Sequence, residues 1–227
     1  MKIIKLIFCT IFLSSLIGCV SNQARTPRID NIPMYGQPEI VRPDFMEKGD
    51  NEFINKVANE FGDRKKASTL WWQQGDKFVN EGNLDYAMRR YNQSWLLNPE
   101  NYQPYWGFGR VMLQQRKYNE SIKNFEKAKS LIDDDYQKVA LLSDFGSVLS
   151  HAAVNSTEVN TKNELYRKAE SNFLESTNLD QKYGKVWLQW AYSLYQQGNY
   201  NESKEKLSKA KSLGESYPKL EELLKSK

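Results

Sequence analysis

The chain has 227 residues, a formal net charge of +4 and 40% hydrophobic residues. This length suits one domain of ordinary size. The near-balanced charge, without a basic stripe interleaved with aromatic residues, argues against nucleic acid as a partner. The two cysteines, Cys9 and Cys19, provide no disulfide framework.

Residues 1–18 are predicted to be an export signal rather than part of the fold. Lys2 and Lys5 flank the start of a mostly apolar run at 6–17, which is shorter than the ~18 residues of a membrane-spanning helix. The ending Leu-Ile-Gly-Cys at 16–19 resembles a bacterial lipobox, in which a signal peptidase cuts before a cysteine that then carries acyl chains. The resemblance implies that Cys19 is a lipidated N-terminus. The alternative is an uncleaved membrane anchor.

Residues 19–44 are predicted to be the lipidated cysteine and a proline-rich tether. Four of the seven prolines of the chain fall here, and no helical or strand period is present. The alternative is a strap in which Met34-Tyr35 and Ile40-Val41 pack on the domain, because apolar pairs are uncommon in free linkers. The next segment, 45–67, is predicted to contain an amphipathic capping helix, since Phe53, Val57 and Phe61 recur every four residues.

A 34-residue period then runs through the chain. Several pairs of similar residues lie 34 positions apart: Trp72 and Trp106, Gly75 and Gly109, Tyr91 and Phe125, Leu97 and Leu131, Phe173 and Leu207. A helical pair is the unit that fits this length. In the first unit, residues follow the pattern W-x2-L-G-x2-Y, A-x3-F, P at Trp71, Gly75, Phe78, Ala87, Tyr91 and Pro99, with Gln74 in place of the leucine. The sequence therefore resembles the tetratricopeptide repeat family, which implies an all-α solenoid of helical hairpins.

Four repeats are predicted, at 68–101, 102–135, 136–183 and 184–217, followed by a C-terminal cap at 218–227. The third is stretched. Gly146 to Ala169 is 23 residues, whereas the equivalent step from Gly75 to Ala87 is 12. This difference indicates an 11-residue insertion, which is predicted to be a protruding polar loop at about 152–162.

The resemblance implies a concave groove lined by the first helix of each repeat. The positions that it assigns to a partner-binding groove are Trp72, Asp76, Asn80, Trp106, Arg110, Gln114, Ser143, Tyr192 and Tyr195. Trp72 and Trp106, beside Arg110, are the residue types that anchor interfaces. The alternative is that both tryptophans pack against the N-terminal helix or strap.

Catalysis finds no support in the sequence. His151 is the single histidine, no glycine-rich phosphate loop is present, and neither a metal nor a cofactor is expected. With the lipobox, the chain resembles tetratricopeptide repeat lipoproteins of the Gram-negative envelope, which include pilotins and adaptors of peptidoglycan enzymes.

That resemblance implies a location at the periplasmic face of the outer membrane, because Val20 replaces the aspartate that signals retention at the inner membrane. We expect a non-enzymatic scaffold that binds a protein or peptide of the envelope and assists complex assembly. One alternative is a binding module for a small envelope ligand, such as a cell-wall fragment held under the inserted loop. Another is a catalytic subunit.

Overall fold

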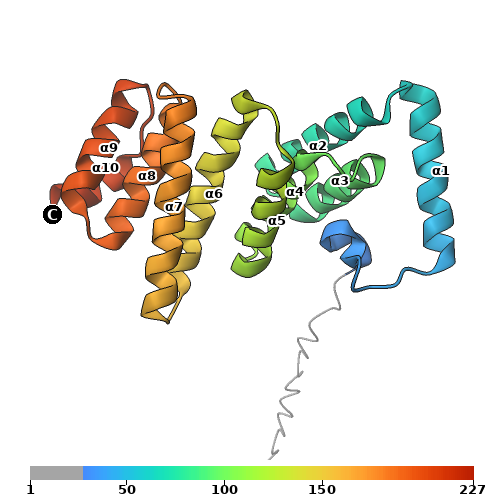
Figure 1. The fold of residues 1–227 in the computed structure, drawn as a ribbon, viewed down its shortest axis with the longest axis horizontal. Helices are drawn as coiled ribbons and strands as arrows, with labels where there is room; N and C mark the ends of the chain where they lie inside the picture. The colour runs from blue at the N-terminus through green and yellow to red at the C-terminus, as the bar shows by residue number, and fades with distance from the viewer. Residues whose placement is uncertain (1–27) are drawn as a thin grey trace, which may run out of the picture.

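The computed structural model describes residues 28–227, which contain ten α-helices, two short 3-10 turns and no strand. Helices α2 to α9 form four antiparallel pairs that stack side by side along the long axis of the molecule (Figure 1). The pairs are α2 (Arg64–Asn80) with α3 (Leu84–Leu97), α4 (Tyr102–Gln114) with α5 (Tyr118–Leu131), α6 (Asp135–Asn155) with α7 (Val159–Leu179), and α8 (Gly184–Gln197) with α9 (Tyr200–Ser212). The predicted all-α stack of helical hairpins is confirmed.

A glycine at each of the first three crossings explains why the helices of a pair approach so closely. A Cβ atom on these glycines would lie 2.4 Å from a ring carbon of the partner helix. The glycine and ring pairs are Gly75 with Tyr91, Gly109 with Phe125, and Gly146 with Phe173. In the fourth pair Ala191 and Leu207 belong to the same buried cluster. The repeat pattern therefore combines a small residue on the first helix with a large one on the second, which fills the space at the crossing.

Two end helices cover the stack. Helix α1 (Asp44–Phe61) packs against α2, where Val57 is buried with Ala67 and Leu97. Gly62, in the left-handed conformation with φ of 67°, ends α1, and the side chain of Asp63 accepts hydrogen bonds from the first backbone amides of α2. At the other end, α10 (Pro218–Lys225) buries Leu220 and Leu224.

Residues 28–36, which we call the strap, lie against α3. They form two short turns, Ile29–Asn31 and Pro33–Gly36. Asn92 on α3 donates its side-chain amide to the carbonyl oxygens of Asp30 and Ile32 at 3.0 and 2.9 Å. Of the predicted tether, residues 28–36 are thus packed on the domain, whereas 38–41 are exposed. The signal peptide and Cys19 lie outside the described residues.

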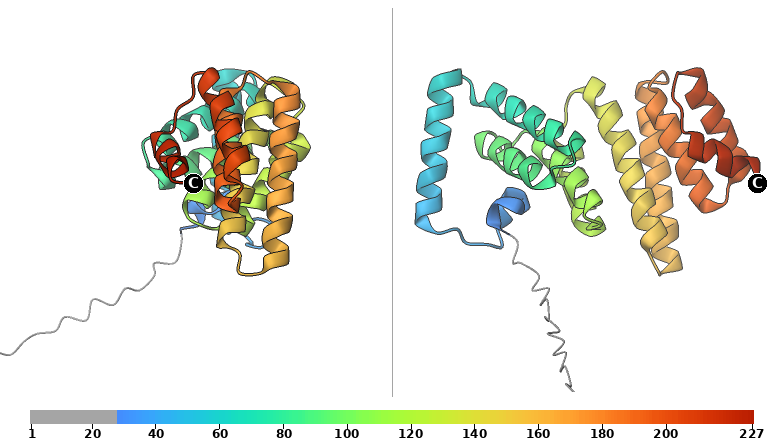
Figure 2. Two further views of the ribbon diagram at one scale, coloured as in Figure 1. Left: turned by 90° about the vertical axis from the view of Figure 1, so that its left-hand side faces the viewer. Right: turned by 180° about the vertical axis from the view of Figure 1, so that it is seen from behind.

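The predicted loop at 152–162 is wrong, because most of these residues are helical. Helices α6 and α7 are each 21 residues long, and only 156–158 connect them. The insertion therefore lengthens both helices, and this pair extends past its neighbours at one edge of the molecule (Figures 1 and 2). Ala152 and Ala153 are buried between the helices, whereas Val159 and most of its neighbours are exposed. A polar sequence suits a solvated helix end as well as a loop.

Candidate functional site

The surface formed by α2, α4, α6 and α8, here called the first-helix face, contains the two predicted anchor residues. The rings of Trp72 and Trp106 stack with their centroids 6.1 Å apart. Trp106 is buried, with 6% exposure, whereas Trp72 is half-buried. The tryptophan that packs against α1 is instead Trp71, whose ring meets Phe53 and Phe61 edge-on. Trp106 therefore packs beneath Trp72, and Trp72 is the more accessible of the two rings.

Charged residues continue this face one helical turn beyond each tryptophan. Arg110 donates to Asp76 at 2.5 Å, and the Tyr91 hydroxyl donates to the same carboxylate oxygen at 2.7 Å. Burial is the largest cause that raises the pKa of Tyr91, and the adjacent Asp76 charge is the second. The Tyr91 hydroxyl therefore remains a donor. Because Arg110 is already paired, a partner would meet a neutralised pair rather than a free guanidinium.

Asp144 on α6 extends the same series, since it lies 34 residues after Arg110. Its carboxylate accepts hydrogen bonds from Trp106 Nε1 at 3.1 Å, Lys185 Nζ at 2.8 Å and Gln189 Nε2 at 3.3 Å. Burial lowers the pKa of Lys185, but the charge and hydrogen bond of Asp144 outweigh it and raise that pKa overall. Lys185 is therefore cationic at neutral pH, and about half of its side chain is exposed.

A cleft of about 150 Å³ opens at the junction between the second and third repeats. Helices α4 and α6 approach each other less closely here than α2 approaches α4 or α6 approaches α8. The cleft is lined by Arg110, Leu113, Gln114, Phe125, Asp144, Ser147, Val148, Lys185 and Gln189. We call it the junction cleft. Its walls combine two ion-paired cations, Arg110 and Lys185, with the Asp144 carboxylate and apolar side chains, and about half of the Lys185 side chain remains exposed.

The other predicted groove residues are scattered. Asn80 and Gln114 are exposed at the ends of α2 and α4, and Gln114 lines the junction cleft. Ser143 is buried and donates to Gln189, so it holds α6 to α8. Tyr192 and Tyr195 pack against the separate C-terminal cluster, where Tyr192 meets Tyr217 edge-on at 5.8 Å. The structure therefore brings Trp72, Asp76, Trp106, Arg110 and Gln114 together, and places the two tyrosines elsewhere.

Sequence reasoning missed Asp144, Lys185 and Gln189. The signal for Asp144 was present, because Asp76, Arg110 and Asp144 are spaced by 34 residues. The glycines of the second and third repeats, Gly109 and Gly146, lie 37 residues apart rather than 34. A third repeat that is placed by its glycine therefore assigns the groove to other residues of α6. The partners of Asp144 come from α8, and no sequence period links them to it.

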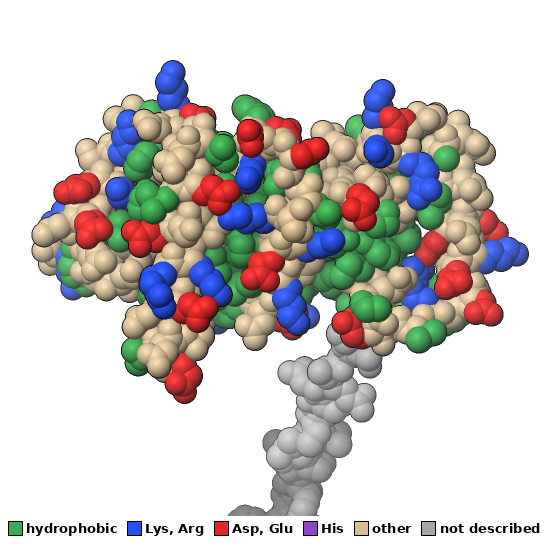
Figure 3. Space-filling view, viewed as in Figure 1, with side chains coloured by type: hydrophobic (Ala, Val, Ile, Leu, Met, Phe, Trp, Pro, Cys, Tyr) green, Lys and Arg blue, Asp and Glu red, His purple; other side chains and the backbone are tan. Residues whose placement is uncertain are grey.

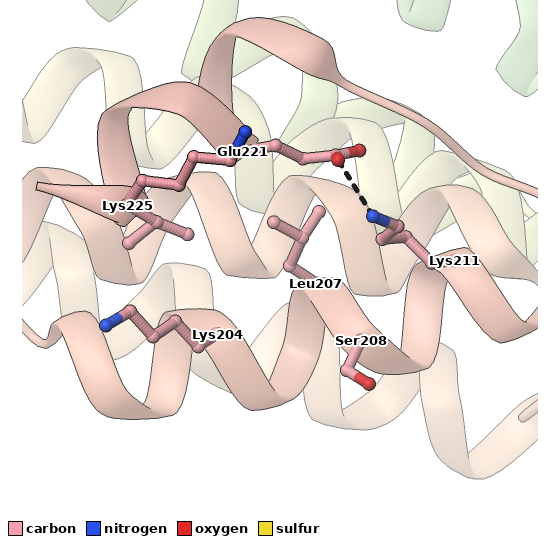
Figure 4. Close-up of a pocket in the computed structure, with 7 residues that line it drawn as sticks. Lys204, Leu207, Ser208, Lys211, Glu221 and Lys225 are labelled. Atoms are coloured by element: carbon pink, nitrogen blue, oxygen red, sulfur yellow. Dashed lines mark hydrogen bonds and ion pairs between the residues drawn. The ribbon is translucent and has the colours of Figure 1, made fainter.

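A second groove lies between α9 and α10 (Figure 4). Leu207 and Leu224 form its apolar part, and Lys211 pairs with Glu221 across it at 2.8 Å. Lys204 and Lys225 are solvated at its rim. On the face shown in Figure 3, acidic and basic side chains are interspersed, with hydrophobic side chains between them. Within residues 28–227 no cluster of three or more metal-ligating side chains occurs.

Comparison with known proteins supports the fold. No protein-family profile matches the chain, and no curated protein has a matching sequence. Among solved structures, the chain is similar to TTC0263, a thermophilic TPR protein in Thermus thermophilus, with a TM-score of 0.60 and 13% identity over 67% of this chain and 77% of that one. It is also similar to MamA, with a TM-score of 0.50 and 12% identity over 77% of this chain and 95% of that one. The chain thus has the tetratricopeptide repeat fold.

In the part of the chain that the structure describes, residues 28–227, none of the helices combines the length and hydropathy of a bilayer-spanning segment.

Proposed function

We propose that the chain is a non-enzymatic scaffold that binds a protein or peptide segment on its first-helix face. The observation that carries this proposal is the position of the half-buried Trp72 ring on the same face as the junction cleft. An aromatic anchor next to a charged cleft is a common arrangement in protein interfaces. It favours a partner segment with an apolar side chain for Trp72 and a carboxylate that would share the half-exposed Lys185 with Asp144.

The charge arrangement favours positioning over proton transfer. Asp76 and Asp144 are each held by a cation and by a neutral donor, which fixes their geometry. Charges held in this way form a fixed pattern on the surface, and a partner with mismatched charges would be repelled. A general acid would instead need to release a proton during the reaction, and a general base would need to take one up.

The size of the cleft favours a side chain of a larger partner over a whole small ligand. Small-molecule sites are usually about 300–1,000 Å³, whereas the junction cleft is about 150 Å³. The insertion that was expected to cover a small ligand is a helical hairpin instead. These two observations argue against a cell-wall fragment held in the junction cleft or under the insertion.

We further propose that the scaffold is anchored through lipid on Cys19 at the periplasmic face of the outer membrane. The sequence at 16–19 supports this location, and Cys19 would be the one cysteine of the mature chain. Cys19→Ser should release the protein from membranes while the domain keeps its helical circular dichroism. Mass spectrometry of the mature protein tests the same point. A chain that retains Met1 or begins elsewhere would contradict the anchor.

The scaffold function itself is tested by capture from solubilised membranes. The wild-type protein and a Trp72→Ala variant are used as baits, and the proteins that they retain are compared. We expect specific partners to be lost from the variant while its melting curve remains cooperative. Equal retention by both folded baits would remove the first-helix face from consideration.

A further inference from the structure

The segment that joins the strap to α1 has an inverted polarity. Arg42 is buried, lies 4.4 Å over the Tyr35 ring and pairs with Asp50. Val41 and Phe45 are large apolar residues on either side of it, yet they are 91% and 74% exposed. Burying a charge is costly unless it is paired, and leaving apolar side chains in water forgoes the gain of their burial. The packing of this chain on itself accounts for Arg42 but not for its neighbours.

Val41 and Arg42 are neighbours in the chain but have opposite surroundings. Arg42 is held inward by Tyr35 and Asp50, whereas the Val41 side chain before it is exposed. Phe45 follows in the first turn of α1, beyond Pro43. Ile40, with 38% exposure, lies next to Val41. We call Ile40, Val41 and Phe45 the N-terminal apolar patch. Three exposed apolar side chains within six residues are available for contact with an apolar surface.

The chain length before the strap indicates what that partner is. Arg28, the first described residue, is nine positions after Cys19, and nine residues span at most about 30 Å when fully extended. The strap and the start of α1 lie at the same edge of the molecule in Figures 1 and 2. A lipid on Cys19 would therefore keep this edge close to the membrane.

We infer that the N-terminal apolar patch lies in the surface of the bilayer that holds the acyl chains of Cys19. This inference rests on the proposed lipid anchor and adds a second membrane contact to it. Apolar and aromatic side chains insert at the boundary between headgroups and acyl chains. Two points of attachment would hold the repeat stack in one orientation above the membrane.

The charges around the patch define the membrane chemistry that it suits. Glu39, Asp44 and Glu47 are exposed beside the patch and outnumber the exposed Lys48, so the local charge repels anionic headgroups. We therefore expect insertion into zwitterionic phosphatidylcholine vesicles, with little effect of salt. Adding anionic phosphatidylglycerol should weaken the contact rather than strengthen it.

The test uses the mature lipidated protein, which begins at Cys19 and so lacks Cys9, reconstituted in phosphatidylcholine vesicles. A cysteine introduced by Phe45→Cys, the one free thiol when Cys19 is acylated, is labelled with a polarity-sensitive dye. The matched control is Tyr136→Cys, because Tyr136 is an aromatic residue with 83% exposure in the first turn of α6, which starts at the opposite edge. Both sites are exposed, so neither label should disturb the core. Circular dichroism checks that both variants are folded, and Val41→Cys provides a second label in the patch.

We expect the emission of the label at position 45 to shift to shorter wavelength on vesicles and to lose most of its quenching by aqueous iodide. The label at position 136 should keep its full quenching. Protein that floats with the vesicles while both labels remain equally quenched would overturn the patch contact and leave the anchor intact. Protein that fails to float would refute the lipid anchor, and the inference with it.

Discussion

The guanidinium of Arg110 lies 2.5 Å from the carboxylate of Asp76, a residue 34 positions earlier in the chain. One repeat length in sequence thus becomes direct contact between successive first helices. Trp72 and Trp106 show the same relationship one turn earlier, with stacked rings. The periodic sequence therefore builds a continuous surface in which each repeat contributes the partner of the next.

Removing the Asp76 carboxylate should destabilise the domain. Asp76→Ala leaves the Tyr91 hydroxyl and Arg110 without this partner, and an unsatisfied polar group in a buried site costs about 1–3 kcal/mol. Asp76→Asn keeps an acceptor for Tyr91 and should cost less than the alanine variant. Urea unfolding measures both changes. Equal losses for the two variants would mean that the hydrogen bond to Tyr91 adds nothing.

The same glycine-to-alanine change should have opposite effects in two helices. A Cβ on Gly109 would meet Phe125 at 2.4 Å, and overpacking of this kind typically costs ~1–3 kcal/mol. Gly49 in α1 has no neighbour within 4 Å of the added atom, so Gly49→Ala should stabilise by up to ~1 kcal/mol through helix propensity. Thermal melts of both variants test this. A harmless Gly109→Ala would show that the first and second helices of this pair are not tightly packed.

Glu175 should make the packing of α7 against α5 and α6 depend on pH. Burial would raise the pKa of Glu175, but the hydrogen bonds and charges of Lys129 and Lys138 outweigh it and lower that pKa. A lowered folded pKa gives stability that is present above the unfolded value of ~4.3 and is lost as the pH falls through the folded value. Because 36% of the side chain is exposed, we expect only ~0.5 kcal/mol.

The pH effect is measured as the stability difference between wild type and Glu175→Gln. This difference should be positive at pH 7 and shrink as the pH drops below the unfolded pKa. Glu170→Gln, an exposed site on the same helix, is the control and should change the profile little. A difference that is constant from pH 7 to pH 3 would show that the ion pairs do not act through the charge of Glu175.

Much of the fold could be predicted because it depends on local periodicity. The spacing of Gly75, Gly109, Tyr91 and Phe125 defines two hairpins, since each glycine must face a ring at a close crossing. The helix bounds of the third repeat do not follow from the sequence, because an insertion breaks the period and its polar residues do not distinguish a loop from exposed helix ends. The attachment of the strap does not follow from it for a related reason. Its attachment depends on Asn92, which recognises backbone carbonyls rather than particular side chains.

The candidate site was predicted in part. Trp72, Asp76, Trp106 and Arg110 follow from position within the repeat, and the structure places them together. The repeat position does not predict whether a side chain is exposed. Trp106 is buried because Trp72 stacks on its ring and Asp144 accepts a hydrogen bond from its Nε1. Lys185 reaches Asp144 from two helices further along the chain, a contact that depends on the packing of α6 against α8.

The central claim is that the first-helix face binds a partner through Trp72 and Lys185. The most direct test compares the proteins that Trp72→Ala, Lys185→Gln and wild-type baits capture from solubilised membranes, with Tyr86→Ala and Lys204→Gln as matched exposed controls on second helices. Loss of an aromatic anchor typically costs ~2 kcal/mol or more, which is about a thirtyfold weaker affinity. We expect the two face variants to lose the partners that the wild type and both controls retain, with all five proteins folded. Retention of the same partners by folded Trp72→Ala and Lys185→Gln would contradict the account.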